Sequence, residues 1–252
     1  ERLFRETQRD VSLRINRVDN KEEWIVSGRG ELHLSILIEN LRREGFEFQV
    51  SRPRVILKEI DGVINEPYEY VQVDVPDEYI GSAIEMFGNR RGNLEGMNSK
   101  DGQTRLIYTI PSKGLIGFMT DFLTATHGYG IINHTFLEYR PVQPDVFMGR
   151  KLGVLVSINQ GMATTYACGG VEDRGELLIE PGIMVYEGMI VGICNREEDL
   201  AVNITREKQM TNQRSATKDS TTVLKKPRVF SLENYLSFID EDELVEVTPN
   251  SI

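Results

Sequence analysis

Apolar and polar residues alternate most regularly between positions 60 and 142, where the pattern predicts strands followed by helices. Val71, Val73 and Val75 are every second residue of one strand, and Pro76 ends it. The next apolar residues recur at helical spacing on one face: Ile80, Ala83, Ile84 and Phe87. We therefore expect a half-buried strand and an amphipathic helix at the start of this stretch.

The same stretch continues with a hairpin and a second helix. Strands are expected over 94–97 and 104–110, with the hairpin loop at 98–102 between them. The helix that follows has three apolar residues on one side: Ile116, Met119 and Leu123. Residues 131–139 supply the last strand. The order β-α-β-β-α-β is that of the ferredoxin-like, or split βαβ, fold.

The first part of the chain follows the same order of elements without an opening strand. Strands are expected over 11–18, 24–26 and 46–50. A helix precedes the last of these strands, and one of its faces is apolar: Leu34, Leu37, Ile38 and Leu41. Residues 1–4 resemble the end of a helix and do not begin with Met, so we expect further residues upstream.

After the prolines at 141 and 144 the sequence pattern changes to short strand candidates separated by glycines. This region contains a polar loop over 205–222 and one helix, for which Ser231 is a suitable N-cap. The apolar residues of that helix share a face: Leu232, Tyr235, Leu236 and Ile239. Residues 244–247 read as a final strand, and no terminating signal follows, so truncation is also expected at this end.

These patterns predict an α+β chain of three domains. Residues 1–59 form a truncated ferredoxin-like domain, residues 60–142 a complete one, and residues 143–252 a mainly β domain with one helix. The composition supports this division, because 252 residues exceed the usual size of one domain. With 40% hydrophobic and 27% charged residues, each domain has enough apolar side chains for a core.

Composition also limits the compartment and the partners. No apolar run approaches the ~20 residues that span a bilayer, and no secretory leader opens the sequence. We therefore expect a cytoplasmic protein with no membrane partner. The two cysteines, Cys168 and Cys194, are too few for a disulfide framework and lack zinc-site spacing, so we interpret both as buried small hydrophobic residues.

The formal net charge of −10 at first argues against nucleic acid. The charge is unevenly distributed, however. Between Thr205 and Arg228 the chain has seven basic residues and two acidic ones, a local balance of +5, which leaves −15 for the remainder. An acidic body with one basic segment indicates a protein that contacts RNA at selected points and does not coat it, and DNA is not expected as a partner.

The polar loop is the most informative segment for function. It is basic, rich in hydroxyl and amide groups, and nearly free of large apolar residues. Such a segment offers cations for phosphates and hydrogen-bond donors for sugars and base edges. The candidate RNA-binding residues are Lys208, Thr211, Asn212, Arg214 and Lys218. A solvated loop without a ligand is the alternative. Because nothing apolar anchors the segment, we expect it to be disordered without RNA.

No catalytic or metal-binding residues are predicted. The chain lacks G-x-x-x-x-G-K-[ST], with which nucleotide hydrolases hold phosphates and Mg²⁺. None of the three histidines, His33, His127 and His134, has a partner at the spacing of helical metal sites. Cys168 precedes a glycine pair, which is typical of tight β turns. An enzyme that uses His127, His134 or Cys168 would need these side chains to converge in a pocket.

Four motifs resemble those of the translational GTPases, and within them the ribosome-associated BipA (TypA) family. Residues 28–34 (GRGELHL) resemble the G-x-G-E-L-H-L turn in domain III of elongation factor G and its relatives. Residues 110–118 (IPSKGLIGF) resemble a segment of the BipA fifth domain. Residues 208–214 resemble the family's K-x-L-T-N-x-R loop, and residues 242–249 its closing strand. The similarity covers essentially the whole chain.

The resemblance implies a function for the chain. In the family, an upstream GTPase domain with GTP and Mg²⁺ and a β-barrel precede these domains, and the protein binds the 70S ribosome at the elongation-factor site. The loop would reach rRNA of the peptidyl transferase region and the acceptor end of A-site tRNA. Lys208, Thr211, Asn212 and Arg214 are the residues that the resemblance carries over. After Arg214 the sequence departs from the family pattern.

The resemblance leads to three further expectations. The fragment itself should hold no cofactor and hydrolyse no nucleotide, and it should be a monomer. Basic residues in two turns of the second domain are candidate secondary ribosome contacts: Arg90, Arg91 and Lys113. The alternative function is a protein-interaction module that docks ribosomal or regulatory proteins through its acidic faces. The whole protein is expected to act in a stress response or in ribosome assembly.

Overall fold

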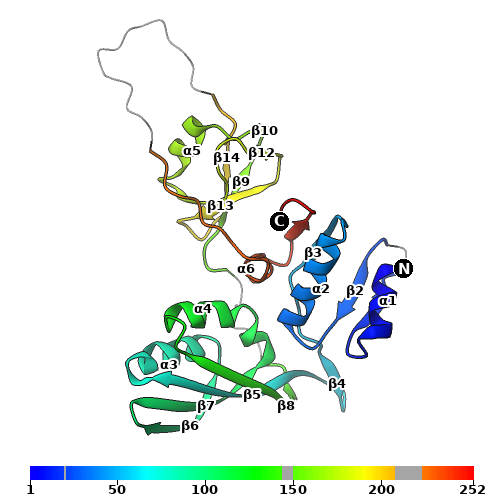
Figure 1. The fold of residues 1–252 in the computed structure, drawn as a ribbon, viewed down its shortest axis with the longest axis vertical. Helices are drawn as coiled ribbons and strands as arrows, with labels where there is room; N and C mark the ends of the chain where they lie inside the picture. The colour runs from blue at the N-terminus through cyan, green and yellow to red at the C-terminus, as the bar shows by residue number, and fades with distance from the viewer. Residues whose placement is uncertain (20, 144–149, 208–222) are drawn as a thin grey trace, which may run out of the picture. The chain divides into compact units, whose positions relative to one another are not determined.

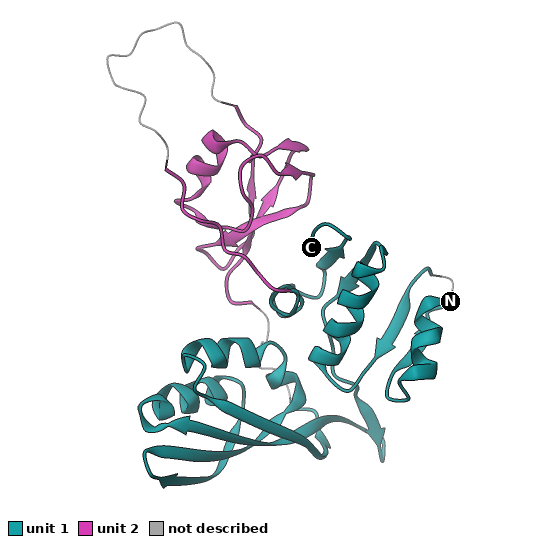
Figure 2. Ribbon diagram, in the orientation of Figure 1, with its two compact units in different colours: residues 1–149, 232–252 teal, residues 150–231 magenta. Residues whose placement is uncertain are grey.

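The computed structural model describes residues 1–19, 21–143, 150–207 and 223–252. The chain divides into two compact units, which Figure 2 shows in separate colours. Unit 1 comprises residues 1–149 and 232–252, and unit 2 comprises residues 150–231. Helices and several small sheets occur together, so the predicted α+β fold class is confirmed.

The largest sheet of unit 1 has the strand order β8-β5-β7-β6, and all neighbours in it are antiparallel. Its strands are β5 (Val63–Pro76), β6 (Asn93–Lys100), β7 (Gln103–Pro111) and β8 (Ile131–Pro141). The short strand β4 (Lys58–Ile60) pairs with the start of β5. Helices α3 (Ile80–Asn89) and α4 (Phe118–Ala125) lie on the same face of the sheet (Figure 1). This is the ferredoxin-like βαββαβ arrangement.

The core between sheet and helices follows from the alternating pattern of β5 and β7. Inward residues of the two strands are at most 1% exposed: Val71, Val73, Val75, Leu106, Tyr108 and Ile110. The helices contribute four more side chains: Ala83, Phe87, Phe118 and Phe122. The ring of Phe87 stacks on that of Tyr108, with 4.4 Å between the centroids. Aromatic rings therefore fill most of the space between the two layers.

The buried face of α4 differs from the predicted one. Met119 and Leu123 are 41% and 40% exposed, whereas Phe118 and Phe122 are buried. The helix begins only at Phe118, because Gly117 adopts a left-handed conformation with φ of 68°. Phe118 and Phe122, at positions i and i+4 of the helix, then point at the sheet in place of the predicted aliphatic side chains. Ile84 of α3 is likewise 39% exposed, since the smaller Ala83 takes the inward position.

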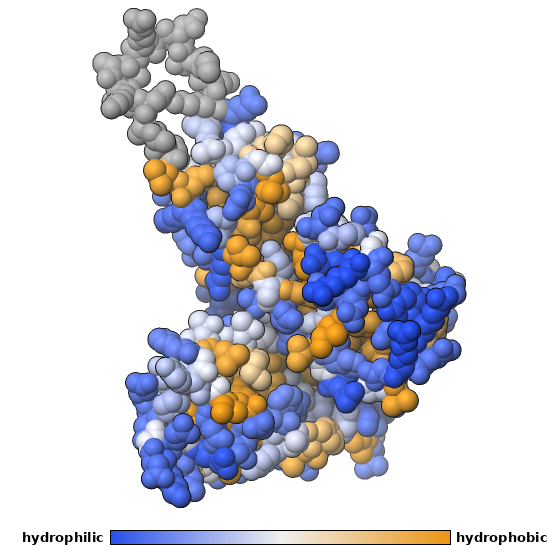
Figure 3. Space-filling view, in the orientation of Figure 1, coloured by the Kyte–Doolittle hydropathy of each residue, from blue (hydrophilic) through white to orange (hydrophobic). Residues whose placement is uncertain are grey.

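The first part of unit 1 contains α1 (Arg2–Arg9), β1 (Arg14–Arg17), β2 (Trp24–Ser27), α2 (Glu31–Arg43) and β3 (Phe48–Ser51). Strands β1 and β2 form an antiparallel hairpin. On α2, the predicted residues Leu37, Ile38 and Leu41 are buried, and Leu34 packs against them. The outer surface over α1 and α2 is mainly hydrophilic (Figure 3). This amphipathic helix is therefore confirmed.

The end of the chain returns to this first part. Helix α6 (Leu232–Phe238) and strand β15 (Leu244–Val247) both belong to unit 1. Strand β15 pairs antiparallel with β3, which confirms the predicted final strand. Side chains from α2, α6 and β15 form one small core: Ile38, Leu232, Leu236, Ile239, Val245 and Val247. Residues at the two ends of the sequence are thus folded into the same unit.

Three helices of unit 1 come together around Gly117. The Gly117 backbone N–H donates to Oε2 of Glu31 at 2.8 Å, and Oε1 of Glu31 is buried without a hydrogen-bond partner among the described residues. Burial raises the pKa of this carboxyl group. A Cβ atom at Gly117 would lie 2.4 Å from Cβ of Ser237. Helices α2, α4 and α6 therefore meet at a position that only glycine fits.

Unit 2 is built on a four-stranded sheet with the order β11-β13-β9-β14. Its strands are β9 (Val154–Ser157), β11 (Gly175–Leu177), β13 (Ile190–Cys194) and β14 (Leu200–Val202). Strands β10 (Gly161–Met162) and β12 (Met184–Val185) form a separate pair. Strand β14 runs parallel to β9, and the other pairs are antiparallel. The predicted mainly β character is confirmed.

Unit 2 also contains a helix that the sequence analysis missed, α5 (Thr165–Val171). The prediction of one helix after residue 143 was therefore wrong, because α5 and α6 are both present. Gly169 and Gly170 lie inside α5 and not in a β turn. The Ala167 N–H donates to Oγ1 of Thr164 at 3.1 Å, which caps the helix. Three buried residues, Ala167, Cys168 and Val171, hold it on the core.

The small core around α6 generates a prediction. Leu236 is 1% exposed, so Leu236→Ala should cost about 2–5 kcal/mol through lost burial and a residual cavity. Hydrogen exchange of the β3 amides should accelerate, while amides of unit 2 keep their protection. Leu244→Ala is the control, because Leu244 lies on β15 but is 52% exposed. Equal acceleration by both variants would contradict a role for this core in holding β15.

Candidate RNA interface

The structure describes both ends of the predicted RNA-binding loop but not the loop itself. Lys208, Thr211, Asn212, Arg214 and Lys218 lie outside the described residues. The chain enters the loop after β14 and is described again from Val223. The candidate site is therefore described through the two segments that flank the loop.

The entering segment is fixed by side-chain hydrogen bonds. Oγ1 of Thr164 donates to the backbone carbonyl of Arg206 at 2.5 Å, so the residue that caps α5 also holds this segment. The backbone N–H and the hydroxyl of Thr205 both donate to Oδ1 of Asn203 at 3.1 Å. Ile204, between these two residues, is fully buried in the core. The loop therefore begins at an anchored position of unit 2.

The returning segment is held by the residue that follows α5 and by β11. The Lys225 N–H donates to Oε1 of Glu172 at 2.7 Å. Three residues later, the Arg228 N–H donates to the carbonyl of Leu177 at 3.0 Å. The Arg228 guanidinium lies 3.6 Å from Oε2 of Glu176. These bonds place the backbone of the returning segment against the sheet and leave two lysine side chains to project from it.

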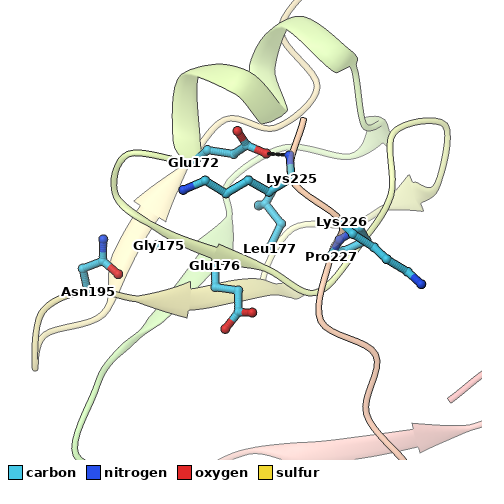
Figure 4. Close-up of a pocket in the computed structure, with 8 residues that line it drawn as sticks. All are labelled: Glu172, Gly175, Glu176, Leu177, Asn195, Lys225, Lys226 and Pro227. Carbon is cyan, nitrogen blue, oxygen red and sulfur yellow. Dashed lines mark hydrogen bonds between the residues drawn. The ribbon is translucent and has the colours of Figure 1, made fainter. Parts of the chain in front are cut away.

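A cavity of about 300 Å³ opens beside the returning segment (Figure 4). The Lys225 and Lys226 side chains leave the segment in opposite directions, so that one cation lies on each side of it. The lining of the cavity comes from the end of α5, the sheet and the returning segment: Glu172, Gly175, Glu176, Leu177, Asn195, Lys225, Lys226 and Pro227. The hollow is therefore bordered by charges of both signs, and its cations come from the returning segment.

Basic side chains are used differently in the two units. In unit 1, many arginines are paired with carboxylates, such as Arg2 with Glu44 at 2.6 Å and Arg105 with Asp74 at 2.7 Å. In the part of unit 2 that the structure describes, several basic residues have no ion pair: Lys151, Arg174, Arg196, Arg206, Lys225 and Lys226. Cations without a carboxylate partner are available to phosphate groups.

Of the three candidate secondary contacts in unit 1, Arg90 and Arg91 lie in the turn after α3, and Lys113 lies in a short 3-10 helix, η2 (Ser112–Leu115). Arg90 donates to the carbonyl of Ile116 at 2.7 Å and lies 3.1 Å from Oδ2 of Asp121. Nζ of Lys113 lies 2.8 Å from Oε2 of Glu66, a carboxylate that is 1% exposed. Arg91 has a left-handed backbone with φ of 62°. The contacts of Arg90 and Lys113 hold the turns around α4, and the role of all three residues on a ribosome stays a prediction.

The side chains considered for catalysis are buried or contact neighbouring side chains of the fold. Cys168 is fully buried in the core of unit 2, and burial raises the pKa of its thiol. His134 pairs with Glu69 on the main sheet of unit 1. The ring of His127 lies 5.7 Å from that of Tyr79. Within the described residues, no group of three or more His, Cys, Asp or Glu side chains is placed to hold a metal ion.

Comparison with known proteins gives three consecutive matches along the chain. Residues 1–52 match the model of elongation factor G domain III, and residues 63–149 match that of the elongation factor G C-terminus. Residues 152–252 match the TypA/BipA C-terminal domain. Over its whole length the chain is 58% identical to the large ribosomal subunit assembly factor BipA of Bacillus subtilis.

The chain belongs to the TypA/BipA family. Proteins with the same name from Synechocystis and from Escherichia coli K12 are each 49% identical to it over 100% of its length. The chain spans 41% of the length of the Bacillus subtilis relative and 42% of the other two. In the part of the chain that the structure describes, no helix has the length and apolar character required to cross a membrane.

The site of this BipA-family chain includes residues that sequence reasoning missed. Thr164, Glu172 and Asn195 are not basic and lie before the polar loop in the sequence, so neither charge nor spacing indicated them. Lys225 and Lys226 contributed to the local charge balance but were not selected as binding residues. A signal for them existed, since they are adjacent bases directly after the polar loop.

Thr164 provides the first test of the site. Thr164→Ala removes both the cap of α5 and the hydrogen bond to Arg206, and the loss should destabilise unit 2 by about 1–2 kcal/mol. Hydrogen exchange of α5 and β14 amides would report it. Thr164→Ser keeps the hydroxyl and should behave like the wild type. Loss of protection in the Ser variant as well would show that the methyl group, and not the hydroxyl, matters.

The pair of His134 and Glu69 generates a pH prediction. The hydrogen bond to Glu69 raises the pKa of His134 above its ordinary value of 6.5. Because the folded state favours the charged ring, its stabilisation is complete below pH 6.5 and is lost as the pH rises through the folded pKa. Thermal melts of unit 1 should show this decline, and His134→Gln should remove it. An NMR titration that gives His134 a pKa below 6.5 would contradict it.

Proposed function

We propose that this chain is the ribosome-binding and RNA-binding part of a translational GTPase of the TypA/BipA family. The observation that carries the proposal is the pair Lys225 and Lys226, which have no ion pair among the described residues and lie directly after the polar loop. The relatives' name, large ribosomal subunit assembly factor, supports a ribosomal partner. RNA phosphates are the ligands that such lysines bind.

The nucleotide chemistry belongs to another part of the whole protein. The sequence has no phosphate-binding loop, and the described side chains form no cluster that fits Mg²⁺. We therefore expect no site for GTP and Mg²⁺ in this chain. We propose that GTP is bound and hydrolysed in the portion of the relatives' length that this chain does not span.

The polar loop is the segment that we propose to bind RNA. Its two ends are anchored to unit 2 at Arg206 and Lys225. The candidate binding residues between these ends are Lys208, Thr211, Asn212, Arg214 and Lys218. We propose that these residues bind rRNA and the acceptor end of A-site tRNA on the 70S ribosome. The protein would act as a monomer in the cytoplasm, in assembly of the large subunit or in a stress response.

A second candidate function is protein docking through the acidic faces. The net charge of −15 outside the basic segment favours it, since basic ribosomal proteins would be complementary to such a surface. The two functions differ in salt dependence and in the residues involved. RNA binding depends on the lysines at the loop ends and loses affinity steeply with salt, whereas docking depends on carboxylates of unit 1.

The deciding experiment is binding of the chain to 70S ribosomes across a salt series. We expect a steep decline for the wild type, and a weaker and shallower one for Lys225→Ala/Lys226→Ala and for Lys208→Ala/Arg214→Ala. Each phosphate contact that is lost should reduce the slope by about one. Lys21→Ala/Lys58→Ala, which removes two lysines of unit 1, is the charge-matched control. Identical binding by every variant would overturn the proposal and favour protein docking.

A further inference from the structure

The main sheet of unit 1 has a second face that the helices do not cover. Directly opposed residues of antiparallel strands point to the same side of a sheet. Tyr70 on β5 is opposed by Thr109 on β7 and by Thr135 on β8. Its neighbours Val71 and Val73 point to the core and are fully buried. Tyr70 therefore lies on the face away from α3 and α4, on one of the two central strands.

Two planar groups on this open face are available for stacking. Tyr70 is 37% exposed. Nearby, the Arg105 guanidinium donates twice to Asp74, at 2.7 and 3.0 Å, and its side chain is still 52% exposed. The Gln72 amide lies between these groups along β5, and its oxygen accepts from Nε of Arg105 at 3.0 Å when the amide is oriented to satisfy both. The guanidinium is thus fixed in position before any ligand arrives.

Polar side chains around these two groups are uncommitted. Asn98 opposes Arg105, Asn133 opposes Gln72, and Thr135 opposes Tyr70. All three are exposed, and within the described residues none of their side chains makes a hydrogen bond. Amide and hydroxyl groups both donate and accept, so they match the mixed edges of nucleic-acid bases.

A second arginine, Arg140, lies toward the other end of this face. The guanidinium of Arg140 lies 4.7 Å from the ring centroid of Tyr68, which is two residues before Tyr70 and on the same side of β5. Its charge is partly balanced by Glu138 at 2.7 Å. Tyr68 is only 7% exposed, so Tyr70 is the ring of this pair that a ligand can reach. Arg105 and Arg140 are each paired with a carboxylate, so they offer planar guanidinium groups and N–H donors to a base and not unpaired charge to phosphates.

We propose that the open face of the β8-β5-β7-β6 sheet binds unstacked bases of single-stranded RNA, with Tyr70 as the stacking surface. Four-stranded sheets with exposed aromatic residues on their central strands bind RNA in this way in other proteins. The exposed amide and hydroxyl groups around Tyr70 favour RNA, because they can donate to and accept from the edges of unstacked bases. The site is separate from the loop of unit 2, although it rests on the proposed RNA-binding function.

The test uses the whole chain and a fluorescein-labelled oligoadenylate, with an RNA duplex as the comparison. Tyr70→Leu should weaken binding of the single strand about tenfold or more, because stacking of one base on an aromatic ring is lost. Tyr70→Phe keeps the ring and should bind within about twofold of the wild type. Tyr129→Leu is the matched control, since Tyr129 is 65% exposed but lies outside the sheet. The duplex, whose bases are stacked internally, should be unaffected by all three variants.

The salt series separates this proposal from the function proposed above. Tyr70→Leu should lower affinity without changing the salt slope, whereas Lys225→Ala/Lys226→Ala should make the slope shallower. If the lysine variant behaves as expected and Tyr70→Leu binds like the wild type, the sheet site is wrong and the loop function stands. If a photoreactive group at position 70 crosslinks only to ribosomal proteins in ribosome complexes, the face is a protein contact and the proposal is also wrong.

Discussion

The pairing of β15 with β3 is the constraint on which the organisation of the chain depends. It joins segments 197 residues apart at Gln49 and Glu246, and it is supported by the core that Leu236 and Val247 share with Ile38. Helix α6 and strand β15 thus cover the same apolar surface of α2. The contact of Glu31 with Gly117 then links this core to the ferredoxin-like sheet. Unit 1 is therefore closed by long-range contacts, and unit 2 lies between two segments of it in the sequence.

The two units differ in how their basic side chains are paired. In unit 1, ion pairs such as those of Arg2, Arg90 and Lys113 hold helices and turns in place. In unit 2, the sheet is held by apolar side chains and by close backbone approach. A Cβ atom at Gly175 would lie 2.0 Å from the carbonyl oxygen of Ile193, so only glycine allows β11 to pack there. Among the described residues of unit 2, the side chains of Lys151, Lys225 and Lys226 form no ion pair.

Local patterns in the sequence predicted much of the fold. The alternation of Val71, Val73 and Val75 and the helical spacing of Leu37, Ile38 and Leu41 correspond to buried faces. The face of α4 was wrong because the start of that helix depends on the left-handed Gly117, which periodicity does not reveal. Helix α5 was missed because its glycine pair has poor helix propensity, and tertiary packing of Cys168 overrides it.

The candidate site was predictable only as a charged segment. Adjacent lysines after a polar loop are visible in the sequence, but the groups that hold them are not. Glu172 and Leu177 reach the returning segment through the fold of unit 2, and nothing in their spacing indicates this. Tyr70 is a second example. Its position on the open face of the main sheet depends on the pairing of β5 with β7 and β8, which the spacing of residues does not indicate.

The position of unit 2 between β8 and α6 has a mechanical consequence. The chain enters unit 2 from one segment of unit 1 and returns to another, so unit 2 is a guest inserted into a host domain. A force applied to unit 2 is shared between two covalent connections. One connection leads to the long β8–β5 ladder, and the other leads to the short β15–β3 ladder. Cleavage of either connection alone would leave the guest attached, whereas a domain at a chain end would be released by one cut.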